Sequence, residues 1–114
     1  MRILGNADST STRHGGYRST DKAFIYSLRN KEGLRPFKSI VKVPSQAIYM
    51  NLGYGPTFGG GHNIYIADMA NGNANSYAQL TYWYNLPSGV NDSRTILAGS
   101  FRFTPDEVEV FYLL

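Results

Sequence analysis

The chain has 114 residues, a mass of 12.7 kDa and no cysteine, so disulfides, thiolate zinc sites and cysteine nucleophiles are excluded. Hydrophobic residues make up 42% and charged residues 17%, a composition that argues against a disordered chain. The net charge of +3 is unevenly spread, because residues 1–45 carry nine basic and three acidic side chains whereas residues 46–114 carry two and five. Such polarity can steer an acidic partner towards one end of the molecule, although a solvated basic surface is the ordinary explanation.

The N-terminal third is predicted to begin as a loop and to continue as two strands. Residues 5–22 are small and polar and offer little that could build a core. Residues 23–28 (AFIYSL) are apolar and β-prone, and residues 37–43 (FKSIVKV) alternate in part, so both predict strands. The intervening segment, residues 29–36, contains a glycine and a proline and predicts a turn.

Three consecutive glycines dominate the middle of the chain, after a short predicted strand at residues 47–51. A phosphate-binding loop would need Lys and Ser or Thr after the glycines, but His62 and Asn63 stand there. A dinucleotide fingerprint would need a helix next, whereas residues 63–68 alternate with the period of a strand. The glycines therefore predict a tight turn in which a Cβ would collide with neighbouring backbone.

The C-terminal third is predicted to be mostly strand. Residues 71–76 form a turn, and residues 77–86 are aromatic and predict a strand, with a helical turn as the other possibility. Residues 95–103 return to β structure, residues 104–107 (TPDE) have the capping box of a one-turn helix, and residues 108–114 predict a last strand. No helix of ten or more residues is predicted, so short strands in an antiparallel sheet or sandwich are expected.

Catalytic and metal-binding patterns are weak. The two histidines, His14 and His62, have only Asp68 nearby and no third ligand at a diagnostic spacing. Glu107 and Glu109 are two residues apart on one predicted strand, whereas paired catalytic carboxylates usually face each other across a cleft. No nucleophile elbow is present. We therefore expect no enzyme activity, no metal and no cofactor.

Several segments together resemble the TLDc domain of oxidation-resistance proteins, from about Gly15 to the C-terminus. The most specific are "GPTFGGGH" with the following "IYIAD" and the terminal "FTPDEVEVFYL". The resemblance implies an α+β, predominantly β fold, in which two antiparallel sheets form a sandwich with a few short helices. It also implies a flexible lead-in at residues 1–14 and a partial TLDc-like domain at residues 15–114, without the N-terminal elements of the family.

The same resemblance implies a non-catalytic, cytoplasmic protein-interaction module that acts in oxidative-stress protection or on subunits of the vacuolar-type proton pump. Nucleic-acid binding and a membrane span are not expected. The expected partner contacts are the residues around the glycines and a set of basic residues: Pro56, Thr57, Phe58, Gly59, Gly60, Gly61, Arg29, Lys31, Arg35 and Lys38. The alternatives are a β-rich module that binds small molecules or carbohydrates through residues 82–84, and a small hydrolase that uses Glu109 or Asp68.

Overall fold

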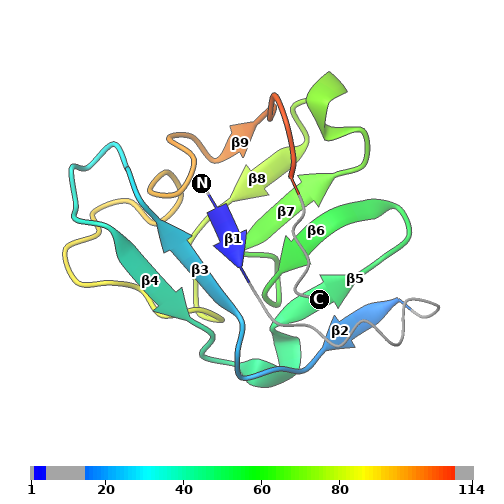
Figure 1. Cartoon of the computed structure of the whole chain (residues 1–114), viewed down its shortest axis with the longest axis horizontal. Coiled ribbons are helices and arrows are strands. Elements are labelled where there is room, and N and C mark those ends of the chain that lie inside the picture. Colours follow the sequence, from blue (N-terminus) through cyan, green and yellow to red (C-terminus); the bar gives the residue numbers. More distant parts are fainter. Residues whose placement is uncertain (1, 5–14, 110–114) are drawn as a thin grey trace.

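The computed structural model describes residues 2–4 and 15–109 and shows two antiparallel sheets. The smaller sheet has the order β1-β3-β4, and the larger sheet has the order β2-β5-β6-β7-β8-β9 (Figure 1). The strands of the smaller sheet are β1 (Arg2–Leu4), β3 (Phe24–Ser27) and β4 (Phe37–Ile40). Those of the larger sheet are β2 (Gly16–Arg18), β5 (Ile48–Met50), β6 (Tyr54–Phe58), β7 (Ile64–Ala67), β8 (Ser76–Ala78) and β9 (Arg102–Phe103).

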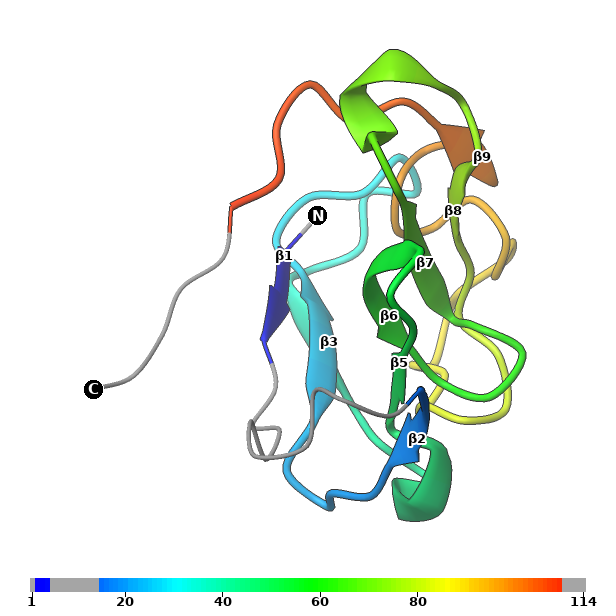
Figure 2. The same ribbon diagram turned by 90° about the vertical axis from the view of Figure 1, so that its right-hand side faces the viewer.

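The two sheets lie face to face as the layers of a sandwich (Figure 2). On the larger sheet, Ile48 pairs with Phe58, Phe58 with Ile64 and Ile64 with Ala78, so one cross-strand line of apolar side chains faces inward. On the smaller sheet, Ile25 faces the same core and is fully buried. The structure therefore confirms the predicted β-rich, antiparallel two-sheet fold. Two short 3₁₀ helices, η2 (Pro44–Gln46) and η3 (Ala70–Gly72), complete the described elements.

The segment between β8 and β9 departs from the predicted strands. Beyond Ala78 it leaves the sheet, and Tyr84 makes an isolated bridge to Val41 of the smaller sheet. Within residues 92–99 the amide of Ile96 donates to Asp92, an i to i−4 bond of a helical turn. The predictions of strands at residues 77–86 and 95–103 were thus wrong except at their ends. Burial of side chains such as Leu80 and Ile96 explains the apolar content of this segment, which packs into the core without pairing as a strand.

The predicted strands at residues 23–28, 37–43, 47–51 and 63–68 are confirmed, and three strands were not predicted. Strands β3, β4, β5 and β7 fall within the expected ranges, whereas β1, β2 and β6 lie where loops or turns were expected. The miss at β6 has a local cause, because its register shifts between Tyr54 and Thr57. This irregularity accommodates Pro56 in a central strand, and Gly55 is needed there because a Cβ would lie 2.9 Å from the Ile66 carbonyl oxygen.

After β9 the chain does not form the predicted one-turn helix at residues 104–107. The capping box has no helix to cap, since the β-branched Val108 follows at once and the side chains of Glu107 and Glu109 are exposed. The predicted last strand does not begin at residues 108–109, and residues 110–114 lie outside the described residues, as does most of the expected lead-in at residues 1–14. In the part of the chain that is described, no helix has the length and apolarity to cross a membrane.

Candidate interaction surface

The three glycines form the turn between β6 and β7, and we call residues Gly59–His62 the glycine turn. The turn is closed by the His62 amide, which donates to the Gly59 carbonyl at 3.2 Å, and Gly59 and Gly61 have φ values of +85° and +73°. A Cβ on Gly59 would lie 2.9 Å from Cγ of Asn63, and a Cβ on Gly60 would lie 2.8 Å from Cε2 of Trp83. The prediction of a close-packed turn is confirmed. The prediction that a Cβ would collide with neighbouring backbone is corrected, because most of the atoms that it would meet belong to side chains.

Trp83 makes the glycine turn part of the joint between the two sheets. Its indole nitrogen donates to Oε1 of Gln46, and its ring lies against Gly60 and Gly61. Its carbonyl accepts a hydrogen bond from the Lys42 amide at 2.7 Å, in the chain that continues from β4. The glycines therefore leave room for an indole that is held by Gln46 of η2 and whose backbone is hydrogen-bonded to the segment after β4, which assigns them a packing role.

The outer face of the larger sheet carries a line of aromatic side chains, one or two from nearly every strand. Tyr17 pairs with Tyr49, Thr57 with Tyr65, and Tyr65 with Tyr77, so these residues share a face opposite to that of the buried Ile64 and Ile66. Tyr54 and His62 contact each other and connect the rings of Tyr49 and Tyr65, and Phe101 lies beside Tyr77. We call the following residues the aromatic row: Tyr17, Tyr49, Tyr54, His62, Tyr65, Tyr77 and Phe101.

Successive rings of the aromatic row are in contact. The centroids of Tyr17 and Tyr49 are 5.0 Å apart, and those of Tyr49 and His62 are 4.9 Å apart. The series continues from Tyr54 to Tyr65 at 4.7 Å, from Tyr65 to Tyr77 at 5.3 Å and from Tyr77 to Phe101 at 4.9 Å. Tyr17 and Tyr54 are each 38% exposed and the other rings are half-buried, largely side by side. The row is thus a continuous, partly exposed aromatic surface.

Two arginines end the aromatic row at β9. The Arg94 guanidinium lies 4.2 Å from the Phe101 ring centroid, and that of Arg102 lies 5.7 Å from both Phe101 and Tyr77. Burial, followed by the neighbouring Tyr54 and Tyr65, raises the pKa of Tyr77 above its usual value of 10.0, with Arg102 opposing the shift. The Tyr77 hydroxyl is therefore protonated at neutral pH. The row presents hydrogen-bond donors along its length and positive charge at one end.

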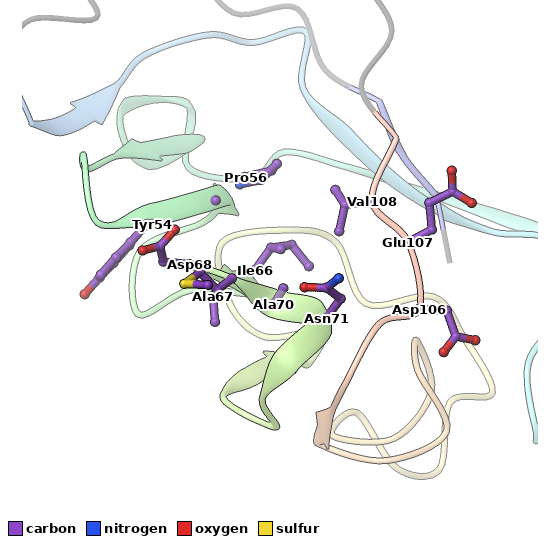
Figure 3. A pocket seen from close by; sticks show the side chains of 12 residues that line it. Tyr54, Pro56, Ile66, Ala67, Asp68, Ala70, Asn71, Asp106, Glu107 and Val108 are labelled. Carbon is purple, nitrogen blue, oxygen red and sulfur yellow. The ribbon is translucent and has the colours of Figure 1, made fainter.

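A groove of about 440 Å³ opens on the other side of β6 and β7, between η3 and the chain that follows β9 (Figure 3). Pro56, Ile66 and Val108 supply apolar lining. The carboxylates of Asp106 and Glu107 point out of the groove and away from Asp68 (Figure 3). No two carboxylates face each other there, and no group of three potential metal ligands exists among the described residues. The groove therefore does not hold the facing pair of carboxylates that a glycosidase-type hydrolase uses.

The structure does not bring the predicted partner contacts together. Thr57, Gly59 and Gly60 are buried, Phe58 packs against the core, and only Pro56 and Gly61 are exposed. The predicted basic contacts belong to the smaller sheet: Arg29, Lys31 and Arg35 lie between β3 and β4, and Lys38 lies on β4, with its Nζ 4.2 Å from the Phe24 ring centroid. These basic side chains are exposed, so they are available to a partner, but on a different part of the molecule (Figure 1).

Sequence reasoning missed the aromatic row because it assigned the aromatics to the core. Tyr84 is the one described tyrosine that is almost fully buried, at 1% exposure, and its hydroxyl donates to the Ala47 carbonyl at 2.8 Å. The expected ligand-binding stretch, residues 82–84, therefore exposes Tyr82 but not the ring of Tyr84. One signal was available: Tyr65 alternates with Ile64 and Ile66, which puts it on the opposite face.

The molecule is therefore a β-sandwich domain that carries the aromatic row on the outer face of its larger sheet. A search of family models gives the family: the model of the TLDc domain matches residues 5–114, nearly the whole chain. The chain belongs to the TLDc domain family. Neither the curated proteins nor the solved structures gave a match to this chain.

Proposed function

We propose that the chain is a non-catalytic protein-interaction module that uses the outer face of the larger sheet as its contact surface. The aromatic row carries this proposal, because tyrosine and arginine are enriched in the centres of protein interfaces and supply large contact area at a low cost in conformational entropy. The carboxylates of Asp106 and Glu107 point away from Asp68, one of the two residues considered for a hydrolase, and the other, Glu109, is exposed and does not line the groove. Membership of the TLDc family supports the same function.

The family also motivates a finer proposal, in which the partner belongs to the cytoplasmic part of the vacuolar-type proton pump and the interaction serves protection against oxidative stress. The exposed basic side chains of the smaller sheet would then act at a distance from the aromatic row, as charges that speed the encounter with an acidic partner. Charge reversal of Arg29, Lys31, Arg35 and Lys38 should slow association and reduce its dependence on salt. Unchanged association kinetics would remove this steering role.

The test is capture of the purified pump by the immobilised 114-residue chain. Tyr65→Ala removes the central ring of the aromatic row, and Tyr26→Ala is the matched control, because Tyr26 is a half-buried tyrosine in the smaller sheet. We expect the Tyr65 variant to lose most of the capture and the Tyr26 variant to retain it. Equal capture by both variants, with the folded state of each verified by circular dichroism, would contradict the proposed contact surface.

A further inference from the structure

The chemistry and spacing of the aromatic row favour one class of ligand. We propose that the row binds a proline-rich peptide in the polyproline II conformation, oriented by an acidic residue at the end near Arg94 and Arg102. This inference rests on the proposed function, because it states the chemistry of the partner segment that the interaction module recognises.

The first argument is the spacing of the rings. Adjacent strands of a sheet lie about 4.8 Å apart, so every second strand recurs at about 9.6 Å across the sheet. A polyproline II helix has three residues per turn at about 3.1 Å each, so side chains on one of its faces recur at about 9.3 Å. A peptide lying across the strands therefore meets equivalent positions on alternate strands, such as Tyr49 on β5 and Tyr65 on β7. Six strands span about 24 Å, which is about eight residues of such a helix.

The second argument is hydrogen bonding. A polyproline II helix makes no internal hydrogen bonds, so its carbonyl oxygens need donors, and its proline rings can pack on an aromatic surface. Tyrosine supplies both a ring and a donor. The Tyr77 hydroxyl can be such a donor, because a tyrosine hydroxyl is protonated at neutral pH and burial raises the pKa of Tyr77 further.

The third argument is charge, which also separates a peptide from a nucleic acid. A single-stranded nucleic acid carries a phosphate at every nucleotide and needs cations along the whole groove. The described cations that contact rings of the row are Arg94 and Arg102, both at its β9 end. Arg102 donates one hydrogen bond to the Asn75 carbonyl at 3.3 Å, and neither guanidinium forms an ion pair with a carboxylate of the described residues, so their charge is available to an acidic side chain of the ligand. A largely neutral peptide with one acidic end fits this distribution.

The test uses the full 114-residue chain, labelled with ¹⁵N, and two synthetic peptides of eight prolines, one ending in two aspartates and the other in two lysines. A control peptide with alternate prolines replaced by glycine lacks the preformed helix. We expect amide shifts confined to the outer face of the larger sheet, with the aspartate peptide binding at least tenfold more tightly than the lysine and glycine peptides. Arg102→Glu should remove the preference for aspartate over lysine.

Tyr77→Phe keeps the ring and should weaken binding about threefold without unfolding the chain, whereas Tyr26→Ala should leave binding unchanged. Absence of shifts at 1 mM peptide, shifts that map to another surface, or equal binding of the glycine control would overturn the proposal. Tighter binding of an oligothymidylate of ten nucleotides would also overturn it, in favour of a nucleic acid. If the peptides fail but capture of the pump still depends on Tyr65, the ligand class is wrong and the proposed function stands.

Discussion

The glycine turn and the middle of the aromatic row belong to the same β6–β7 hairpin, yet they meet opposite physical demands. At the glycine turn every missing Cβ leaves room for another group, chiefly the indole of Trp83. In the aromatic row large side chains pack against one another and against Arg94 and Arg102 on an outer face, where they are half-buried or exposed. The comparison shows that the most conspicuous motif in this sequence serves packing, whereas the surface suited to binding is built from residues on five strands, in the glycine turn and in the segment just before β9.

The largest expected effect is at Gly60. Its φ is not left-handed, so Gly60→Val tests steric contact alone: the new side chain must displace Trp83 and break the hydrogen bond to Gln46. Overpacking of this kind is expected to lower the free energy of unfolding by about 3 kcal/mol. Urea denaturation followed by the fluorescence of Trp83, the sole tryptophan, measures it.

Gly72→Ala is the matched control, because nothing lies within 4 Å of the Cβ it would add. We expect the control to change stability by no more than about 0.5 kcal/mol. If Gly60→Val were as stable as the control, the turn would not be filled by Trp83 and its role in packing would be refuted.

The next prediction concerns the tyrosine inside the sandwich. Tyr84→Phe removes the donor to the Ala47 carbonyl, which still accepts from the Gly59 amide at 3.0 Å. The loss in the free energy of unfolding should be about 1–2 kcal/mol, the usual cost of a buried hydrogen bond with a partly satisfied partner. Thermal and urea unfolding of the variant beside the wild type provide the measurement, and a variant as stable as the wild type would place the hydroxyl in contact with water.

The same tyrosine predicts a dependence on alkaline pH. Burial raises the pKa of Tyr84 far above its usual value of 10.0, so the folded state keeps its proton where the unfolded state loses it. Stability is therefore fully present below about pH 10 and falls as the pH rises above it. Urea unfolding at pH 8 and pH 10.5 should show this fall, and Tyr84→Phe should reduce it more than Tyr77→Phe does. If both variants reduced the alkaline loss of stability equally, Tyr84 in the interior would not differ from Tyr77 in the aromatic row, and the prediction would be wrong.

These contrasts also show how much of the molecule the sequence could predict. Strands β3, β4, β5 and β7 were predictable, because their apolar and β-branched residues form a local pattern that is typical of a strand with a buried face. Strand β6 was not, because Gly55 and Pro56 suggest a turn until the irregular register beside Ile66 is known. The helical turn around Ile96 was not predicted, because it depends on burial of that side chain in the core. The helix predicted at residues 104–107 is absent, because no helical residues follow its capping box.

The candidate site was less predictable than the fold. Three adjacent glycines are enough to predict the glycine turn. That the Trp83 side chain packs against them could not be predicted, because Trp83 lies more than twenty residues further along the chain. The aromatic row depends on the register of five strand pairs, and no local pattern specifies which tyrosines become neighbours. The pairing of strands that are far apart in the sequence is therefore what sequence reasoning could not predict.

A smaller effect is expected in the middle of the aromatic row. Tyr65→Ala removes ring contacts with Tyr54 and Tyr77 on a half-buried face and should lower the free energy of unfolding by about 1 kcal/mol. Tyr65→Phe keeps those contacts and should be close to neutral. Urea titration of both variants gives their free energies of unfolding, which are compared with that of Gly60→Val. If Tyr65→Ala lost as much stability as Gly60→Val, the aromatic row would be part of the structural core.

The smallest effect is expected at the arginine end, where a structural role and a binding role separate most clearly. Arg94 is exposed and its guanidinium stacks on Phe101, an interaction worth about 0.5 kcal/mol at such sites. Arg94→Gln should therefore leave the unfolding midpoint almost unchanged, while it weakens binding of an acidic ligand and lowers the salt dependence of that binding. Calorimetric titrations at 50 mM and 300 mM salt measure both quantities. A variant that unfolds readily, or that binds with unaltered salt dependence, would remove Arg94 from the interaction surface and leave the aromatic rings to act alone.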